Sequence, residues 1–386
     1  MSLTANIYPS TIALAGNPIK LTINSSSVVS YTIRQADRTI FSGSGEGEFS
    51  VFLQDILSGI LSPKHLLNES TDILLPDSTS ATDIAISVQN TQGETKTLSL
   101  KAVIGGISKR LLRRLLDENS NIFTWKLLNS SVNFFKTTRT NGRIITIRET
   151  ELLPIPFLYP DGALKIVAAG IETSLSGTAG QPVALNLYRL RQKLFQTNQK
   201  LASVFDIYSG STKSCTIVIT PGTVSRERYL LEFLNSYGAY ERIEVTGIGN
   251  IESEIESDST YQIYDESIDD YIEARERQSA RDKLQVESGY RNTEELVHLM
   301  DMLASDDIKI LGLSGRNIRV NAVADNLTHA IRSTVPESIK MTLHFVDSDV
   351  RYTGSLSEDE IGNPRIHTEQ FTPQFNGYVR SATNYR

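Results

Sequence analysis

The chain has 386 residues, of which 39% are hydrophobic and 22% are charged, and its formal net charge is −7 at pH 7. This balance is typical of folded globular proteins and excludes a chain that is disordered throughout. A negative chain lacks the positive field that displaces counterions from phosphate, so we expect no direct nucleic-acid binding.

The opening residues lack the basic segment and apolar run of a secretory signal, and no apolar run reaches the roughly 20 residues that span a bilayer. We therefore expect synthesis in the cytoplasm and no membrane insertion. Cys215 is the single cysteine, which excludes an internal disulfide. Its apolar, strand-like surroundings predict a small core residue.

Short alternating segments dominate the first hundred residues and predict an N-terminal β-sandwich module over residues 1–104. The glycine-rich run 42–47 predicts a turn between two strands. A phosphate-binding loop is not expected there, because a strand and not a helix follows. The polar run 89–94 predicts a hairpin.

Residues 105–250 predict a middle β domain with a short amphipathic helix at its start. Between 107 and 118, four leucines fall on one face, and lysine and arginine fill the rest. We interpret the basic face as solvated, although it could also meet phosphate or lipid. Residues 140–142 predict a tight turn, and the run 183–190 predicts a strand.

Residues 251–354 predict a C-terminal mixed β domain with a helix at about 292–304. Asn292 is the candidate N-cap, and Glu295 follows three residues later as in a capping box. Charge is dense between 251 and 290, which fits either a long exposed helix or a protruding pair of strands. The isoleucines there make a poor helical stripe, so we favour strands.

Residues 355–386 predict an extended tail without a core, because apolar residues are few and two prolines oppose a helix. The alternative is a simple disordered chain end. Five widely spaced side chains would suit an arm that fills separate pockets on a neighbouring subunit. These candidate assembly residues are Ile366, Phe371, Phe375, Tyr378 and Tyr385. The expected fold is thus mainly β with a few short helices, as several β-sandwich-like domains plus an extended C-terminal arm.

The sequence contains no recognisable catalytic, cofactor-binding or metal motif. No P-loop is present, and no two of the five histidines share a metal-ligand spacing; His298 is expected to face solvent. The carboxylates most suited to a hard cation lack the glycine turn and bidentate glutamate of calcium loops. These carboxylates are Asp265, Glu266, Asp269 and Asp270, and separately Asp347 and Asp349. We expect no catalytic site, no cofactor and no metal.

Three segments carry a family resemblance. Residues 49–57, FSVFLQDIL, have a strand that ends in Asp-Ile-Leu, and residues 229–241 contain the pattern F-L-N-x-[FY]-G-x-x-E. The third is the helix ending at residues 301–307, followed by the expected hairpin 308–323. Together they resemble tail or baseplate-region virion structural proteins of phages and prophages of Bacteroidetes-type bacteria. The resemblance implies a structural role with no catalytic residues.

The leading expectation is therefore a structural subunit of a bacteriophage tail or baseplate, located in the virion. It would act as a homo-oligomer, such as a ring, and contact other tail or baseplate proteins. Two alternatives stay open: a receptor- or glycan-binding adsorption protein, and a glycan-degrading enzyme, whose two carboxylates would meet only in the fold.

Overall fold

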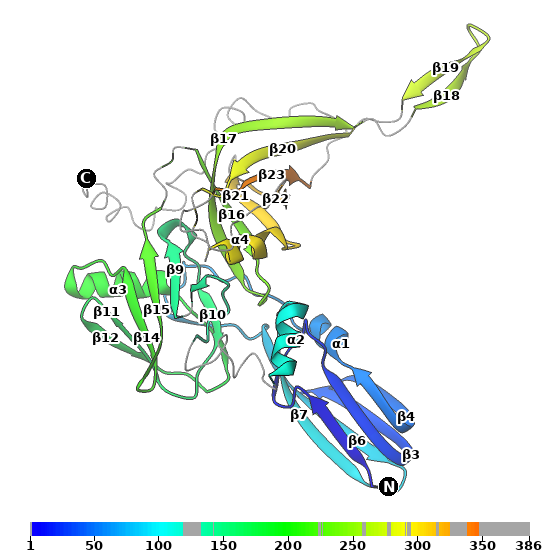
Figure 1. The fold of residues 1–386 in the computed structure, drawn as a ribbon, viewed down its shortest axis with the longest axis vertical. Helices are drawn as coiled ribbons and strands as arrows, with labels where there is room; N and C mark the ends of the chain where they lie inside the picture. Colours follow the sequence, from blue (N-terminus) through cyan, green and yellow to red (C-terminus); the bar gives the residue numbers. More distant parts are fainter. Residues whose placement is uncertain are drawn as a thin grey trace. The chain divides into compact units, whose positions relative to one another are not determined.

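The computed structural model describes residues 2–118, 133–141, 143–222, 225, 227–256, 260–275, 279–289, 291, 295–313, 316–324 and 338–346. The chain divides into two compact units, each described here by itself. Unit 1 takes in Met1–Ile147, Leu152–Thr220 and Leu234–Glu241, and unit 2 takes in Arg148–Glu151, Pro221–Phe233 and Arg242–Arg386. Strands dominate both units (Figure 1), which confirms the expected mainly β fold. The domain boundaries drawn from the sequence stay predictions.

A six-stranded sheet in unit 1 wraps an aliphatic core. Its elements are β1 (Thr4–Tyr8), β2 (Ile12–Leu14), β3 (Lys20–Gln35), β4 (Arg38–Phe52), β6 (Ala81–Asn90) and β7 (Thr95–Val103), with the short helix α1 (Gln54–Ile60) after β4. β3 pairs with β4 over most of its length, with β1 through residues 20–24 and with β6 through residues 29–35. A register shift between Ser25 and Val29 marks the change of partner.

Residues 42–47 continue β4, so the predicted turn at these glycines is wrong. The chain reverses earlier, at Ala36, whose φ is 48°. Two of the glycines are required for space. A Cβ at Gly43 would lie 2.4 Å from the hydroxyl of Tyr31, and one at Gly45 would lie 2.7 Å from the ring of Phe49. The glycines therefore leave room for two aromatic rings over the sheet.

Two further sheets of unit 1 surround a second core. The three-stranded sheet has the order β10 (Ile155–Leu158), β13 (Pro182–Leu185), β5 (Leu74–Pro76). The six-stranded sheet has the order β12 (Ile171–Leu175), β11 (Leu164–Ala168), β14 (Val204–Ser209), β15 (Thr212–Thr220), β9 (Ile144–Arg148), β8 (Thr140–Asn141). Phe134, Phe135 and Phe157 meet in the core with ring centroids 4.7–5.2 Å apart. β8 and β9 pair as an antiparallel hairpin, but Thr140 and Asn141 of the predicted turn belong to the strand, and residue 142 lies outside the described residues.

Two helices complete unit 1. Helix α2 (Lys109–Asp117) is the predicted amphipathic helix, and it packs Leu115 against Leu14 and Val103. Helix α3 (Leu187–Asn198) begins inside the segment predicted as a strand, which is a correction from residue 187 onward. The reason is Asn186, whose side-chain oxygen accepts a hydrogen bond from the backbone N–H of Arg189 at 3.1 Å and so caps the helix.

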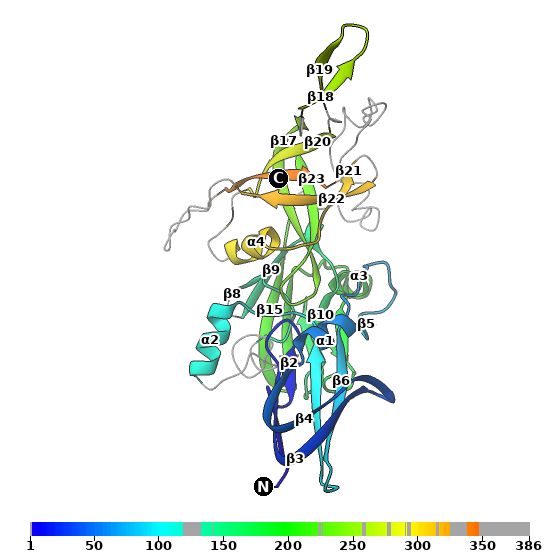
Figure 2. The same ribbon diagram turned by 90° about the vertical axis from the view of Figure 1, so that its right-hand side faces the viewer.

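Unit 2 is built on a closed six-stranded barrel (Figure 2). Its order is β16 (Arg228–Leu234), β17 (Tyr240–Glu256), β20 (Ser279–Glu287), β23 (Lys340–Phe345), β22 (Arg316–Val323), β21 (Ile308–Leu313). A 3-10 turn, η1 (Glu149–Glu151), precedes them in the chain. Helix α4 (Leu296–Leu303) buries Leu299 and Met302 in the barrel core. The predicted helix is confirmed there, while its candidate cap Asn292 lies outside the described residues.

The densely charged segment 251–290 forms strands, as favoured from the sequence. β18 (Thr260–Asp265) and β19 (Asp270–Arg275) make a separate antiparallel hairpin between β17 and β20. β17 and β20 pair from Ile251–Leu284 to Glu256–Ser279, and the hairpin is a separate two-stranded sheet.

Candidate functional site

The β18–β19 hairpin is the most exposed apolar feature among the described residues. Its register pairs Ile263 with Ile272 and Tyr264 with Tyr271, and in the described part of the chain no other strand pairs with it. The exposed fractions run from 41% at Ile272 to 63% at Tyr271. The exposed apolar side chains are Tyr261, Ile263, Tyr264, Ile268, Tyr271 and Ile272. Figure 1 shows the hairpin as the two arrows labelled β18 and β19.

Strand alternation sorts these side chains onto two faces. Tyr261, Ile263 and Ile272 share one face. Tyr264 and Tyr271 share the other, where their rings meet edge to face at 5.3 Å. A two-stranded hairpin is marginally stable in water by itself. Exposed apolar surface on both faces, with both edges open, is the pattern of a segment that packs against a partner.

The four residues that join the strands form an acidic turn. Asp265 accepts hydrogen bonds from the backbone and hydroxyl of Ser267 at 2.9 and 2.6 Å, and these bonds lower the pKa of Asp265. Asp269 has a φ of 55° and accepts a hydrogen bond from the hydroxyl of Tyr264, which raises the pKa of that tyrosine. The turn is therefore built by its own carboxylates.

The carboxylates that the sequence analysis considered for a cation, and for which it expected no metal, do not converge on one point. Asp265 and Asp270 face each other across the hairpin end, while Asp269 is engaged with Tyr264. Among the described residues, no group of three histidine, cysteine or acidic side chains is placed to hold a metal. Asp347 and Asp349 lie outside the described residues.

Two residues singled out for chemistry are buried. Cys215 is fully buried as predicted, and desolvation raises the pKa of its thiol to about 12, so a nucleophilic thiolate does not form near neutral pH. His298 is 2% exposed and its ring lies 5.1 Å from that of Phe233, so the expected solvent-facing position is wrong. The apolar face of α4 includes this histidine.

Unit 2 contains a buried ionic network whose charged groups bind one another. Arg291 donates to Glu151 and Glu295 at 3.2 Å each, to the backbone oxygen of Glu244 at 2.6 Å and to that of Ser288 at 3.1 Å. Burial alone would lower the pKa of Arg291, but the two carboxylates outweigh it and raise the pKa. The network links η1 to the barrel, so we interpret its role as structural.

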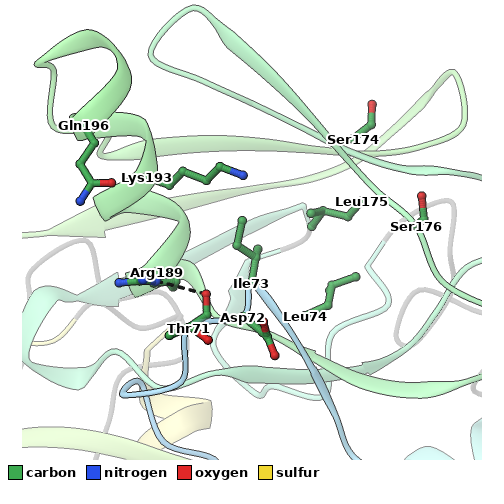
Figure 3. Close-up of a pocket in the computed structure, with 10 residues that line it drawn as sticks. All are labelled: Thr71, Asp72, Ile73, Leu74, Ser174, Leu175, Ser176, Arg189, Lys193 and Gln196. Carbon is green, nitrogen blue, oxygen red and sulfur yellow. Dashed lines mark hydrogen bonds between the residues drawn. The ribbon is translucent and has the colours of Figure 1, made fainter.

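A cavity of about 590 Å³ opens beside α3 in unit 1 (Figure 3). Arg189 and Lys193 come from the helix and Asp72 from the segment before β5, and the Nε of Arg189 donates to the backbone oxygen of Thr71 at 3.2 Å. The lining residues offer charge and hydroxyl groups, but no histidine or cysteine is among them. The cavity therefore supplies charged and polar contacts.

Sequence reasoning placed the candidate assembly arm in the tail, and Ile366, Phe371, Phe375, Tyr378 and Tyr385 all lie outside the described residues. It missed the three tyrosines of the hairpin. The available signal was the alternation of Tyr261 with Ile263, and the placement of Tyr264 and Tyr271 on either side of an acidic turn.

No family model and no curated protein matches this chain. Among solved structures, similarity was found to a bacterial ice-binding adhesin (12% identity, 71% of this chain and 96% of that chain, TM-score 0.16). The periplasmic chaperone SfaE is also similar (8% identity, 57% and 100%, TM-score 0.19), as are carbohydrate-binding modules of the β-sandwich superfamily (9% identity, 90% and 94%, TM-score 0.15). Similarities this low carry no argument about fold or function.

Within the described residues, every helix falls short of the length and apolar character that crossing a bilayer requires.

Proposed function

We propose that this chain is a structural subunit of a bacteriophage tail or baseplate that assembles through its β18–β19 hairpin. The observation that supports assembly is the hairpin itself, which carries exposed isoleucines and tyrosines on both faces and has no core of its own. The phage setting, with its location in the virion, rests on the sequence resemblance. Its partners would be further copies of the chain in a ring, and neighbouring tail or baseplate proteins.

Burial of the hairpin side chains would stabilise an assembly by the usual hydrophobic gain, about 25 cal/mol for each Å² of apolar surface removed from water. Aromatic side chains are also enriched at the centres of protein interfaces, where they lose little conformational freedom. The hairpin therefore has the composition of an interface anchor.

The test is self-association of the full chain by sedimentation velocity over a range of protein concentrations. A variant with Tyr261→Ser, Ile263→Ser and Ile272→Ser is expected to dissociate at concentrations at least about tenfold higher than wild type does, as expected when hot-spot residues are removed. The matched control replaces three apolar residues exposed elsewhere, Val28→Ser, Phe52→Ser and Val204→Ser. A wild-type chain that stays monomeric at every concentration contradicts the proposal.

The second candidate function is adsorption to a host-surface glycan, and the exposed tyrosines favour it. Tyr261, Tyr264 and Tyr271 are 47–63% exposed, and aromatic rings of this kind stack on sugar faces. Binding of the full chain to purified host glycan, lost on Tyr271→Ala with no change in self-association, would support adsorption over assembly.

A further inference from the structure

We infer that the β18–β19 hairpin of one copy docks on the exposed basic face of helix α2 of a second copy. This inference rests on the proposed function and adds the partner surface to it. It is carried by the opposite charges and matching exposed apolar groups of the two elements.

The hairpin is strongly acidic. Residues 260–275 contain five acidic side chains and one arginine. Asp265 and Asp270 are directly paired across the strands, and like charges in that position oppose each other. A basic surface against this end of the hairpin would relieve the repulsion.

Helix α2 has the reverse arrangement. Lys109, Arg110 and Arg113 are exposed, and their spacings of three and four residues set like charges side by side on one helix. Arg114 is paired with Glu118 at 2.9 Å, which leaves the other three as the accessible cations. The chain that follows the helix, residues 119–132, contains no aspartate or glutamate that could neutralise them.

The two elements also match in their apolar groups. Leu116 of α2 is 47% exposed and falls on the same helix face as Leu112 and Arg113. The hairpin offers Ile268 at its turn and Tyr271 beside it, exposed by 59% and 63%. An isoleucine–leucine contact ringed by ion pairs gives a small interface with an apolar centre and a charged rim.

A second copy is the occupant that satisfies both surfaces at once. An anionic lipid surface or nucleic acid would neutralise α2 but leave the acidic hairpin uncovered. Because the two surfaces are different patches of one chain, their contact either closes reciprocally between two copies or repeats head to tail from copy to copy. The repeated head-to-tail contact is the one that generates rings or filaments. This is the type of assembly that the proposed function requires.

Charge reversal tests the pairing. The hairpin variant carries Glu266→Lys, Asp270→Lys and Glu273→Lys, which spares the turn-forming Asp265 and Asp269. The helix variant carries Lys109→Glu, Arg110→Glu and Arg113→Glu. A control with the same change of net charge as the hairpin variant replaces exposed residues of unit 1, with Asp37→Lys, Glu46→Lys and Glu48→Lys. Each full-length protein is measured by sedimentation velocity at low and high salt.

Each reversed variant alone is expected to lose self-association by at least tenfold at low salt, whereas the control keeps it. An equimolar mixture of the two variants is expected to assemble again, because the basic hairpin of one then meets the acidic helix of the other. A contact within a single chain would not be restored by mixing, and that outcome overturns the inference.

If neither triple charge reversal weakens self-association, the inference is also overturned, but the proposed function is not. Loss with the hairpin variant alone points to a different partner surface and rejects α2. A helix variant that assembles normally but loses binding to anionic vesicles or to DNA assigns α2 to that ligand and rejects the docking. A wild-type chain that never associates removes both the inference and the proposed function.

Discussion

Arg291 illustrates how single residues hold unit 2 together. Its guanidinium is 1% exposed and is compensated by two carboxylates and two backbone oxygens. Arg291→Met removes the cation that is hydrogen-bonded to the buried Glu151, so we expect the free energy of unfolding to fall by about 3–5 kcal/mol. Urea unfolding measures this change, with the exposed Arg38→Met as control. An effect of the same small size in both variants would show that the network contributes little.

Lys136 gives unit 1 a pH-dependent stability. Its ammonium is buried and has no hydrogen-bond partner among the described residues, and desolvation lowers the pKa to about 8, although Asp77 acts in the opposite direction. The unfolded chain, where lysine keeps its ordinary pKa of about 10.4, binds more protons above pH 8. The contribution of Lys136 therefore becomes less destabilising as pH rises from about 8 to about 10.

Lys136→Met removes that penalty. The variant is expected to exceed wild type in free energy of unfolding by up to about 3 kcal/mol near neutral pH, and the difference is expected to vanish by about pH 10.5. Urea unfolding curves across this pH range, with the exposed Lys96→Met as control, measure it. A difference that stays constant with pH would exclude the titration of Lys136 as its cause.

The burial of a single residue could be predicted where the residues beside it in the sequence are mostly apolar. Cys215 lies in an apolar alternating run, and its burial follows from that run. His298 was wrongly predicted to face solvent because its side chain is polar. Its burial is instead set by the face of α4 that meets the barrel core. The burial of Arg291 could not be predicted from local sequence, since two of its partners, Glu151 and Glu244, lie 140 and 47 residues away in the chain.

At the scale of elements, the alternation of apolar and polar residues predicted strands correctly, whereas a run of glycines led to a wrongly predicted turn. The segment 42–47 has the composition of a turn, yet its glycines serve ring packing inside β4. The strand predicted at 183–190 ignored the capping side chain of Asn186, which starts α3. The strands of 251–290 were correct because the isoleucine spacing excludes a helical stripe.

The role of the β4 glycines is testable. Gly43→Ala places a Cβ against the buried ring of Tyr31, so we expect a loss of about 1–3 kcal/mol in the free energy of unfolding. The control is Gly59→Ala in α1, where no heavy atom lies within 4 Å and alanine favours the helix by about 0.5–1 kcal/mol. Opposite shifts in thermal midpoint are expected. Equal shifts would mean that Tyr31 moves freely.

At the scale of the whole molecule, the sequence reached the mainly β class and the strand character of the charged segment. It did not reach the closed barrel of unit 2, because closure depends on β16 pairing with β21, whose residues lie far apart in the chain. The exposed tyrosines of the hairpin could not be predicted from the sequence for a different reason. Exposure of a tyrosine is a property of the fold around it, and the sequence records only its spacing.

The C-terminal tail supplies the last prediction at this scale. Residues 355–386 are mostly polar, and their apolar side chains, which include Ile366, Phe371 and Phe375, are widely spaced and too few to build a core. Ordering such a segment costs about 1–2 kcal/mol per residue, so contacts with a neighbouring subunit must provide the compensation. Deleting residues 356–386 is expected to leave the melting temperature of the monomer unchanged and to weaken assembly, as measured by sedimentation velocity. Replacing Phe371, Phe375 and Tyr378 by serine in the full-length chain should reproduce the loss, because the side chains and not the length of the tail would make the contact. A truncated chain that assembles as well as the full chain would confine assembly to the folded units.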